Sequence, residues 1–341
     1  MTITSEIVSA PAEPIAGKTR LHLVDIVKGV AIALVVYGHT AQGMTHRGWW
    51  TGPGYDFSRA FIYSFHMPAF FFVAGLFLHG SLNRRGWKPF VTEKLKTILY
   101  PYALWCFIGF LAIPLTWWVH AQEGAVSYGQ LGRDILDGNV SWFLYTLFLC
   151  FMLALLTIKM PNWLRFVLAA MVSILTPNIY GQIVLKLPHE FCFLAAGMWV
   201  GGSIHRVHEL KPAVAAIGFC MLMAVQAMVI HLYGEPGPYL FIPLGLLGTA
   251  ALFLLARALE HSRTGMLLIW TGQASLGIFL FSAYLQVGVR ETLARVLHTH
   301  AFWPQIVLPT LAAILIPAII WHRQKQWKVA WLFRWPNRSA A

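Results

Sequence analysis

Two histidines and an acid–base pair are the residues whose types and spacing could do chemistry in this chain. Asp25 and Lys28 stand three residues apart, so on a helix they share a face and can pair. His39 follows about three turns later, on the same face and roughly 16 Å further along the axis. All three interrupt an apolar stretch, and ionisable groups inside a membrane helix cost on the order of 2.5–3.5 kcal/mol each on insertion scales. They therefore indicate a functional site, with a cation at one depth and a proton acceptor at another.

His66 is the second candidate proton acceptor. Pro68 removes a backbone donor and should bend or loosen the helix beside it. A short connection joins the apolar runs that carry His39 and His66, so two antiparallel helices can bring both imidazoles to one pocket. The alternative is structural: His66 hydrogen-bonds a carbonyl group at the bend.

A basic cluster follows the second apolar run and consists of Arg84, Arg85, Lys88, Lys94 and Lys96. Clustered cations beside a membrane pocket can hold phosphate groups. The same cluster is also the strongest positive-inside signal of the chain, which is enough to explain it, and spacing does not separate the two interpretations.

Other kinds of site are disfavoured. Two histidines without a zinc-binding spacing are too few for a metal centre, and Glu190 is either the partner of a histidine or an ordinary interfacial carboxylate. The cysteines all lie in apolar runs without metal-ligand spacing, which is typical of buried, reduced thiols; they are Cys106, Cys150, Cys192 and Cys220. The net charge of +12 is divided among short clusters between apolar runs, so nucleic-acid binding is not indicated.

The elements that must position these groups are membrane helices. Hydrophobic residues make up 58% of the chain and charged residues 11%, whereas soluble domains have about 25% charged residues. We expect an all-α polytopic membrane protein with ten transmembrane helices, because bilayer-length apolar runs fall at 23–42, 57–79, 97–119, 141–158, 163–180, 188–204, 212–232, 239–259, 266–288 and 303–321.

The basic residues predict the orientation of these helices. They concentrate in alternate connections, so both termini should be cytoplasmic, with Lys28 toward the cytoplasm and His39 toward the outer side. The predicted division is a cytoplasmic tail at 1–20, a membrane-embedded domain at 21–322 and a basic cytoplasmic tail at 323–341.

Together these motifs resemble the acyltransferase 3 family of integral membrane O-acyltransferases, in particular its single-domain members similar to fucose O-acetylases. The resemblance is carried by residues 23–29 running to Gly38-His39, which keep the family's basic residue, ten-residue gap and histidine, with Lys28 where many members have Arg. Residues 65–75 and 94–102 also match, and 142–148, 197–201 and 267–276 match more loosely. Many relatives have a histidine where this chain has Ser282.

The resemblance implies transfer of an acyl group, usually acetyl from acetyl-CoA, to a sugar hydroxyl at the cytoplasmic (inner) membrane of a bacterium. Acetyl-CoA would be a donor substrate and not a permanently bound cofactor, and the other partners would be a carbohydrate or glycolipid acceptor and the bilayer, with homo-oligomerisation left open. We expect His39 to act as general base, His66 to orient the acceptor or donate to the oxyanion, and Asp25 to orient Lys28. The phosphates would be held by Lys28, Arg84, Arg85, Lys94 and Lys96.

Two other functions remain open from the sequence. One is a transporter or flippase of a polar or lipid-linked solute, with Lys28 and the histidines lining its pathway. The other is a catalytically idle membrane protein on the same scaffold. The absence of an internal sequence repeat weakens the case for a transporter built from inverted halves.

Overall fold

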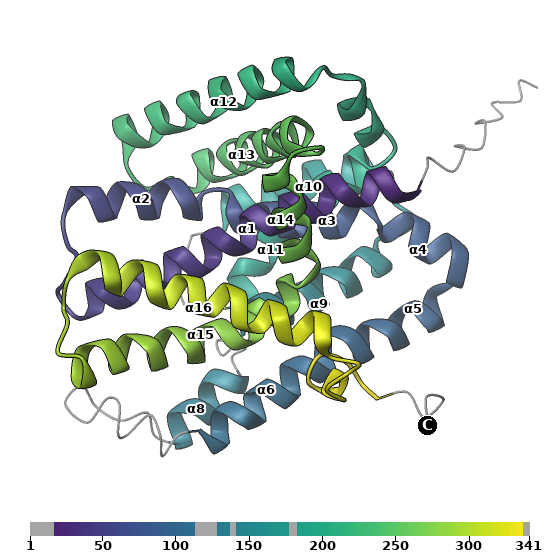
Figure 1. Cartoon of the computed structure of the whole chain (residues 1–341). Coiled ribbons are helices and arrows are strands. Elements are labelled where there is room, and N and C mark those ends of the chain that lie inside the picture. The colour runs from purple at the N-terminus through teal and green to yellow at the C-terminus, as the bar shows by residue number, and fades with distance from the viewer. Residues whose placement is uncertain (1–16, 113–127, 137–140, 177–182, 337–341) are drawn as a thin grey trace, which may run out of the picture.

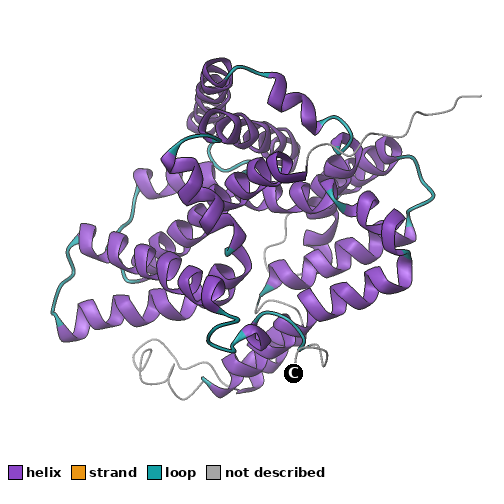
Figure 2. Ribbon diagram, turned by 45° about the vertical axis from the view of Figure 1, so that its right-hand side comes forward, coloured by secondary structure: helices purple, strands orange, loops and turns teal. Residues whose placement is uncertain are grey.

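The chain folds into a bundle of helices joined by short connections (Figures 1 and 2). The structure is a computed structural model, and it describes residues 17–112, 128–136, 141–176 and 183–336. Within these ranges there is no β-strand, which agrees with the predicted all-α class. The α-helices are α1 (Gly17–His46), α2 (Pro53–Tyr63), α3 (His66–Leu76), α4 (Leu78–Arg85), α5 (Trp87–Lys94), α6 (Tyr100–Leu111), α8 (Tyr128–Leu136), α9 (Trp142–Leu156), α10 (Asn162–Leu175), α11 (Ile183–Val200), α12 (Pro212–Tyr233), α13 (Pro238–Leu259), α14 (Arg263–Gln273), α15 (Ser275–Glu291) and α16 (Phe302–Arg323).

Five stretches of the described chain are long and apolar enough to cross a membrane, which makes this an integral membrane protein: His22–His46, Pro53–Arg85, Pro212–Tyr233, Pro238–Leu259 and Phe302–Arg323. A sixth is possible if α14 and α15, bent by 79° at their junction, form one broken span. Ten runs were predicted, and the difference lies in the middle of the chain. There the apolar runs form shorter helices, such as α9 with 15 residues and α10 with 14.

The helix that carries Asp25, Lys28 and His39, α1, lies at the centre of the bundle (Figure 1). It packs against α3, α13, α14, α15 and α16. Its N-terminal half meets α14 closely, because a Cβ atom on Gly29 would overlap the backbone carbonyl of Leu268. Small residues at such crossings let membrane helices approach to backbone contact. The tight crossing fixes the depth at which Lys28 lies.

The interruption predicted beside His66 is present. Helix α2 ends at Tyr63 and α3 begins at His66, so the second span is broken immediately before this histidine. The side chain of Gln226 on α12 holds the break by donating to Ser64 Oγ over 2.6 Å. Pro68 falls in the first turn of α3, where its missing N–H removes no intrahelical hydrogen bond.

Helix α11 is seated tightly on α3. A Cβ atom on Gly75 would overlap the carbonyl of Leu194, and one on Gly197 would overlap the carbonyl of Phe72. This pair of close approaches fixes the wall formed by α11 relative to His66 on α3.

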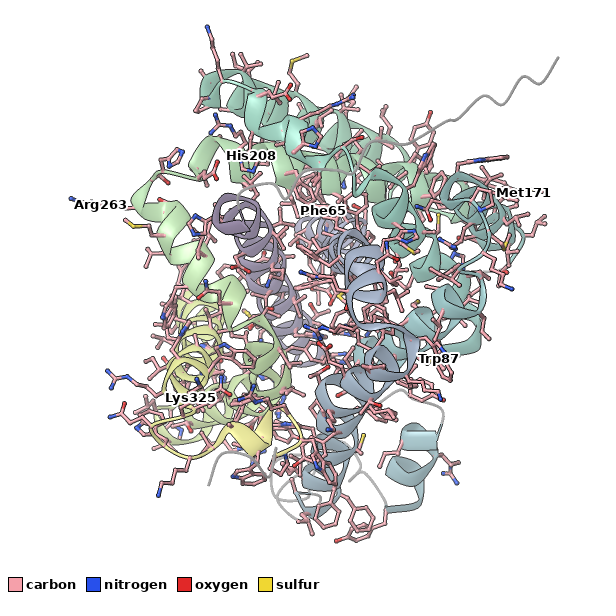
Figure 3. The ribbon with its side chains drawn as sticks, turned by 90° about the vertical axis from the view of Figure 1, so that its right-hand side faces the viewer. Phe65, Trp87, Met171, His208, Arg263 and Lys325 are labelled. Atoms are coloured by element: carbon pink, nitrogen blue, oxygen red, sulfur yellow. The ribbon has the colours of Figure 1, made fainter. Side chains whose placement is uncertain are left out.

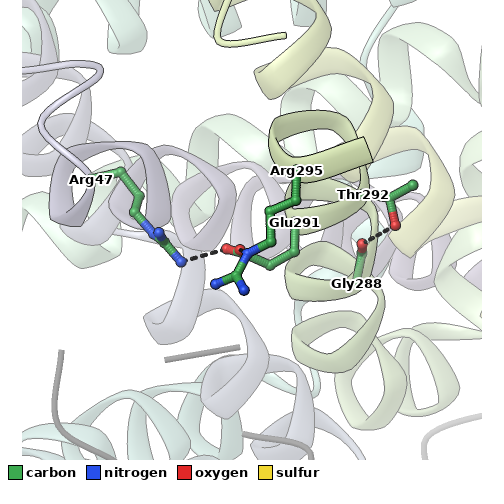
Figure 4. A network of polar contacts seen from close by, with 5 residues as sticks. All are labelled: Arg47, Gly288, Glu291, Thr292 and Arg295. Carbon is green, nitrogen blue, oxygen red and sulfur yellow. Dashed lines mark hydrogen bonds and ion pairs between the residues drawn. The ribbon is translucent and has the colours of Figure 1, made fainter. Parts of the chain in front are cut away.

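An ion-pair network joins the ends of α1 and α15 (Figure 4). The Glu291 carboxylate accepts from Arg47 Nη2 over 2.5 Å and from Arg295 Nε over 2.8 Å. Beside it, Thr292 Oγ1 donates to the Gly288 carbonyl over 2.8 Å, at the start of a π-helical turn (Thr292–Val296). Because the Glu291 side chain is almost fully buried, this network ties the two helix ends together firmly.

The segment after α16 turns back onto the bundle. The backbone N–H of Trp335 donates to the Lys96 carbonyl over 3.0 Å, and Trp105 Nε1 donates to the Leu332 carbonyl over 3.0 Å. Phe333 is only 1% exposed. The described part of the predicted tail at 323–341 is therefore anchored to the bundle through Phe333, although most of its other residues are exposed.

The exterior is apolar, as expected of a surface that faces lipid. Figure 3 places Met171 and Trp87 at the periphery and Phe65 between the helices. Helix α12 is the most exposed of the five membrane-length stretches, because only 17% of its most apolar part is buried within the protein. Cys220 lies on this helix and is exposed, which corrects the expectation that all four thiols are buried; Cys106, Cys150 and Cys192 are buried.

Candidate active site

Both candidate histidines line a single cavity of about 370 Å³, called here the histidine cavity. The prediction that the two imidazoles share one pocket is therefore confirmed. The polar side chains around it come from α1, α2, α3 and α11 and from the connection before α13; they are His39, Gln42, Arg59, Tyr63, Ser64, His66, Lys186, His189, Glu190 and Glu235. Its volume lies in the range of about 300–1,000 Å³ that is common for small-molecule sites.

His66 is 3% exposed and has a defined tautomer. Its Nδ1 lies 2.7 Å from the carbonyl oxygen of Ile62 at the end of α2. A carbonyl can only accept, so Nδ1 carries a proton, and in the neutral ring Nε2 is left as an acceptor. The two interpretations of His66 made from the sequence thus hold together: it bonds a carbonyl at the break and lines the cavity.

His39 differs from His66 in being exposed within the cavity. Its ring hydrogen-bonds the side chain of Gln42, one turn further along α1. It also interacts electrostatically with His66. The pair therefore presents one accessible imidazole and one imidazole held in a fixed orientation.

Asp25 and Lys28 pair as predicted, with 2.7 Å between Oδ1 and Nζ. Gln273 Nε2 on α14 donates to the other carboxylate oxygen of Asp25 over 3.3 Å. The carboxylate is thus held from two sides, and it keeps the Lys28 ammonium in place.

Lys28 lines a second cavity of about 250 Å³, the apolar cavity, whose walls are mainly side chains of α1, α3, α9 and α15. It adjoins the histidine cavity, because Val35, Met67 and Phe279 line both. Helix α1 thus places Lys28 beside the apolar cavity and His39 beside the histidine cavity.

A third cavity of about 620 Å³, the basic cavity, is open to the outside. Its cations are Arg85, Lys88, Lys96 and Arg334. Arg85 is paired with Glu93, which also lines this cavity. Thr97 lines both the basic and the apolar cavity, so the three cavities form a series.

Two predicted phosphate ligands do not line this series. Arg84 Nε donates to the Gly80 carbonyl of its own helix over 2.9 Å. The Lys94 ammonium lies over the rings of Phe90 and Phe151, at 5.2 and 4.4 Å from their centroids. Burial, together with the charge of Arg85, lowers the pKa of Lys94 to about 8. The structure thus gives Lys94 a packed position against aromatic rings.

Arg334 joins the basic cavity from the far end of the sequence, and no local pattern could have indicated it. The fold brings it there by packing Phe333 into the core beside it. Lys88 was recognised as part of the basic cluster, but only the structure distinguishes it from Arg84 and Lys94.

Metal ligation has no candidate residues in the part of the chain that the structure describes. No group of three or more His, Cys, Asp or Glu side chains is close enough there to hold an ion. The polar groups that line the series of cavities include cations, hydroxyl groups, three imidazoles and the buried carboxyl group of Glu190.

The series is suited to a long ligand with an anionic end. Four cations gather at its open mouth, the middle is apolar, and the far end holds two imidazoles. An imidazole with a free nitrogen in such a cavity can take a proton from a hydroxyl group.

Comparison with known proteins points to one family. The model of the acyltransferase 3 family, described as an acyltransferase domain, matches residues 21–322. The nodulation protein NolL of Mesorhizobium japonicum is 25% identical over 228 residues, which are 61% of this chain and 55% of that protein. The protein of the same name from Sinorhizobium fredii is 26% identical over 186 residues, which are 53% of this chain and 48% of that protein. The chain thus spans about half the length of these relatives, and no solved structure matches it.

Proposed function

This chain belongs to the acyltransferase 3 family, and we propose that it is a membrane O-acyltransferase that moves an acetyl group from acetyl-CoA to a carbohydrate hydroxyl. The observation that carries the proposal is the series of three cavities. It joins a cationic mouth to a pair of histidines through an apolar middle section. Acetyl-CoA has the matching order of parts, with phosphates at one end, a slender pantetheine arm and a thioester at the other end.

The donor enters from the basic cavity. Its phosphates bind to Arg85, Lys88, Lys96 and Arg334, and Arg334 supplies the planar fork that suits phosphate oxygens. Lys28 lies further in, where the pantetheine arm enters the apolar cavity, and Asp25 holds its ammonium in position. The arm then spans the roughly 16 Å of helix between Lys28 and His39.

The transfer step takes place between the two histidines. The acceptor hydroxyl oxygen attacks the thioester carbonyl while His39 takes the hydroxyl proton. The tetrahedral intermediate collapses with cleavage of the C–S bond, and the thiolate of CoA leaves and takes a proton. The products are an O-acetyl ester and free CoA.

His66 orients the acceptor in this scheme. Because its Nδ1 proton is engaged by the Ile62 carbonyl, the neutral ring can only accept at Nε2. That favours a hydrogen bond from a neighbouring hydroxyl of the acceptor, because the attacking hydroxyl gives its one proton to His39. It disfavours the other role expected from the sequence, donation to the oxyanion. Tyr63, which lines the same cavity, carries a hydroxyl that can donate to the developing charge.

The finer topology and the location belong to the same proposal. Ten spans with both termini in the cytoplasm would open the basic cavity toward the cytoplasmic pool of acetyl-CoA. The histidine cavity would then face the outer half of the inner membrane of a bacterium. A surface polysaccharide, glycolipid or lipid-linked sugar would be the acceptor at that side.

The test is acceptor-dependent release of CoA by the full chain in lipid nanodiscs. Labelled acetyl-CoA and a mixture of membrane glycolipids and polysaccharide are supplied to the wild type and to His39→Gln. We expect the wild type to release CoA and label the glycan, and His39→Gln to lose about 10²–10⁴-fold in rate while acetyl-CoA still binds. His205→Gln is the matched control, because His205 is half-buried and does not line any of the three cavities.

A transporter gives a different result in this experiment. It would leave acetyl-CoA intact whatever acceptor is present. Normal turnover by a correctly folded His39→Gln variant would refute the assignment of His39 as base.

A further inference from the structure

One wall of the histidine cavity carries polar groups that the proposed transfer step does not use. Helix α11 contributes three of them, Lys186, His189 and Glu190, within two turns. They face the cavity from the helix that is seated on α3, so their distance from His66 is fixed by backbone packing.

Glu190 is the unusual member of this group. It is 5% exposed, and its Oε2 is fully buried without a hydrogen-bond partner among the described residues. The nearest cation on the same helix, Lys186, interacts electrostatically with Glu190 but makes no hydrogen bond to its Oε2, and its ammonium lies over the ring of Trp142, at 4.7 Å from the centroid. A buried carboxyl group without a partner is costly, so a partner is expected to come from a ligand.

His189, the residue before Glu190, also has a buried polar atom without a hydrogen-bond partner among the described residues. Its Nδ1 lies 2.5 Å from Ser173 Oγ on α10, which fixes the ring. Its Nε2 is buried and has no partner in the described part of the chain. Two neighbouring polar atoms, Glu190 Oε2 and His189 Nε2, thus lack partners in the wall of one cavity that both residues line.

We propose that Glu190 and His189 form the acceptor-binding subsite and hold the hydroxyl groups beside the one that is acetylated. This inference rests on the proposed acetyl transfer and adds the residues that bind the acceptor. The carboxyl group of Glu190 accepts hydrogen bonds from hydroxyl groups. His39 and His66 line the same cavity, so one acceptor ring can present its reacting hydroxyl to the histidines and its neighbouring hydroxyls to Glu190 and His189.

The burial of this subsite selects the class of acceptor. An uncharged polyhydroxyl ring supplies donors to Glu190, whereas a uronic acid would bring a charged carboxylate into a buried site, which costs desolvation energy. Arg59 and Glu235, which also line the cavity, are 2.6 Å apart and engage each other. The acceptor class is therefore a neutral sugar ring.

The test compares two probes that differ only in this charge, methyl α-D-galactopyranoside and its uronic acid counterpart, methyl α-D-galacturonide. Wild type, Glu190→Gln and His189→Asn are assayed in nanodiscs with labelled acetyl-CoA. Glu209→Gln is the control, since Glu209 is an exposed carboxylate outside the cavity. Binding of acetyl-CoA is measured separately by equilibrium dialysis, and size-exclusion chromatography checks the fold.

We expect wild type to prefer the galactoside, and Glu190→Gln to raise the KM for it by on the order of tenfold or more. The KM for acetyl-CoA should stay unchanged, and the preference against the galacturonide should shrink. His189→Asn should also raise the KM for the galactoside, while Glu209→Gln should match wild type.

Several outcomes would overturn the inference. They are an unchanged KM for the galactoside in Glu190→Gln, an equal rise in the KM values for both substrates, or a wild-type preference for the galacturonide. A wild type that binds acetyl-CoA but transfers to neither probe would also overturn it. A wild type that does not bind acetyl-CoA refutes the proposed function itself, and the dialysis measurement separates that case from the others.

Discussion

At the scale of residues, the two histidines divide the work because their surroundings differ. His66 is fixed by the carbonyl of Ile62, which sets its tautomer, whereas His39 is exposed within the cavity. The sequence alone placed both residues correctly in one pocket. It could not assign the tautomer, because that depends on which backbone group lies at the break between α2 and α3.

The variant His66→Asn tests the role of Nε2 of His66 separately from that of Nδ1. In His66→Asn the side-chain amide can still donate to the Ile62 carbonyl, but it has no group at the position of Nε2. We expect the variant to fold, with a melting temperature close to that of wild type, and to lose roughly 10²-fold in turnover. Turnover is measured as labelled acetyl ester formed per protein. A His66→Asn variant as active as wild type would remove His66 from the reaction.

Two lysines provide a matched comparison in the donor site. Lys28 lines the apolar cavity, whereas Lys94 lies over two aromatic rings. We expect Lys28→Met to raise the KM for acetyl-CoA by about tenfold or more, since a hydrogen bond to a charged group contributes about 1.5–3 kcal/mol. Lys94→Met should leave that KM nearly unchanged. The opposite ranking in steady-state kinetics would move the phosphate site toward Lys94.

At the scale of elements, glycines set the distance between the walls of the histidine cavity. The apolar runs at 57–79 and 188–204 predicted two membrane helices but not that these helices pack against each other. The partner of each glycine, Leu194 for Gly75 and Phe72 for Gly197, comes from tertiary packing, which periodicity does not encode. The count of ten spans stays a prediction, since the predicted runs 97–119 and 163–180 extend beyond the described residues. Length and hydropathy do not show where a run breaks into shorter helices.

Gly75 and Gly80 allow a test of this packing within one span. A Cβ atom on Gly75 meets the Leu194 carbonyl, whereas one on Gly80 meets no atom within 4 Å. We expect Gly75→Ala to cost about 1–3 kcal/mol of stability through overpacking. Gly80→Ala should be neutral or stabilising by up to about 1 kcal/mol, because alanine favours the helix. Thermal unfolding in detergent measures both, and equal melting temperatures would contradict the close packing.

At the scale of the whole molecule, the donor site is assembled from distant parts of the chain. Arg85, Lys88 and Lys96 come from the first third, and Arg334 comes from the C-terminal segment (Figure 1). The sequence predicted the first group from local clustering. It assigned Arg334 to a tail, because nothing local indicates that Phe333 enters the core.

Removing the charge of Arg334 tests this assembly. We expect Arg334→Gln to raise the KM for acetyl-CoA several-fold with little change in kcat, because the side chain binds phosphate far from the reacting atoms. The effect should weaken as salt is added, since the site is open to solvent. Arg263→Gln is the control, because Arg263 is exposed and does not line the basic cavity. An identical KM in the two variants would exclude Arg334 from the donor site.

The central claim is that one path joins the basic mouth to the histidines, and a bulky side chain in its middle tests this most directly. Ala74 lines the apolar cavity, so Ala74→Phe should block the pantetheine arm. We expect this variant to bind adenosine 3′,5′-bisphosphate as wild type does and to lose at least about 10²-fold in acetyl transfer. Ala213→Phe, on the exposed side of α12, should behave as wild type in both measurements. Undiminished acetyl transfer by a folded Ala74→Phe variant would contradict the path.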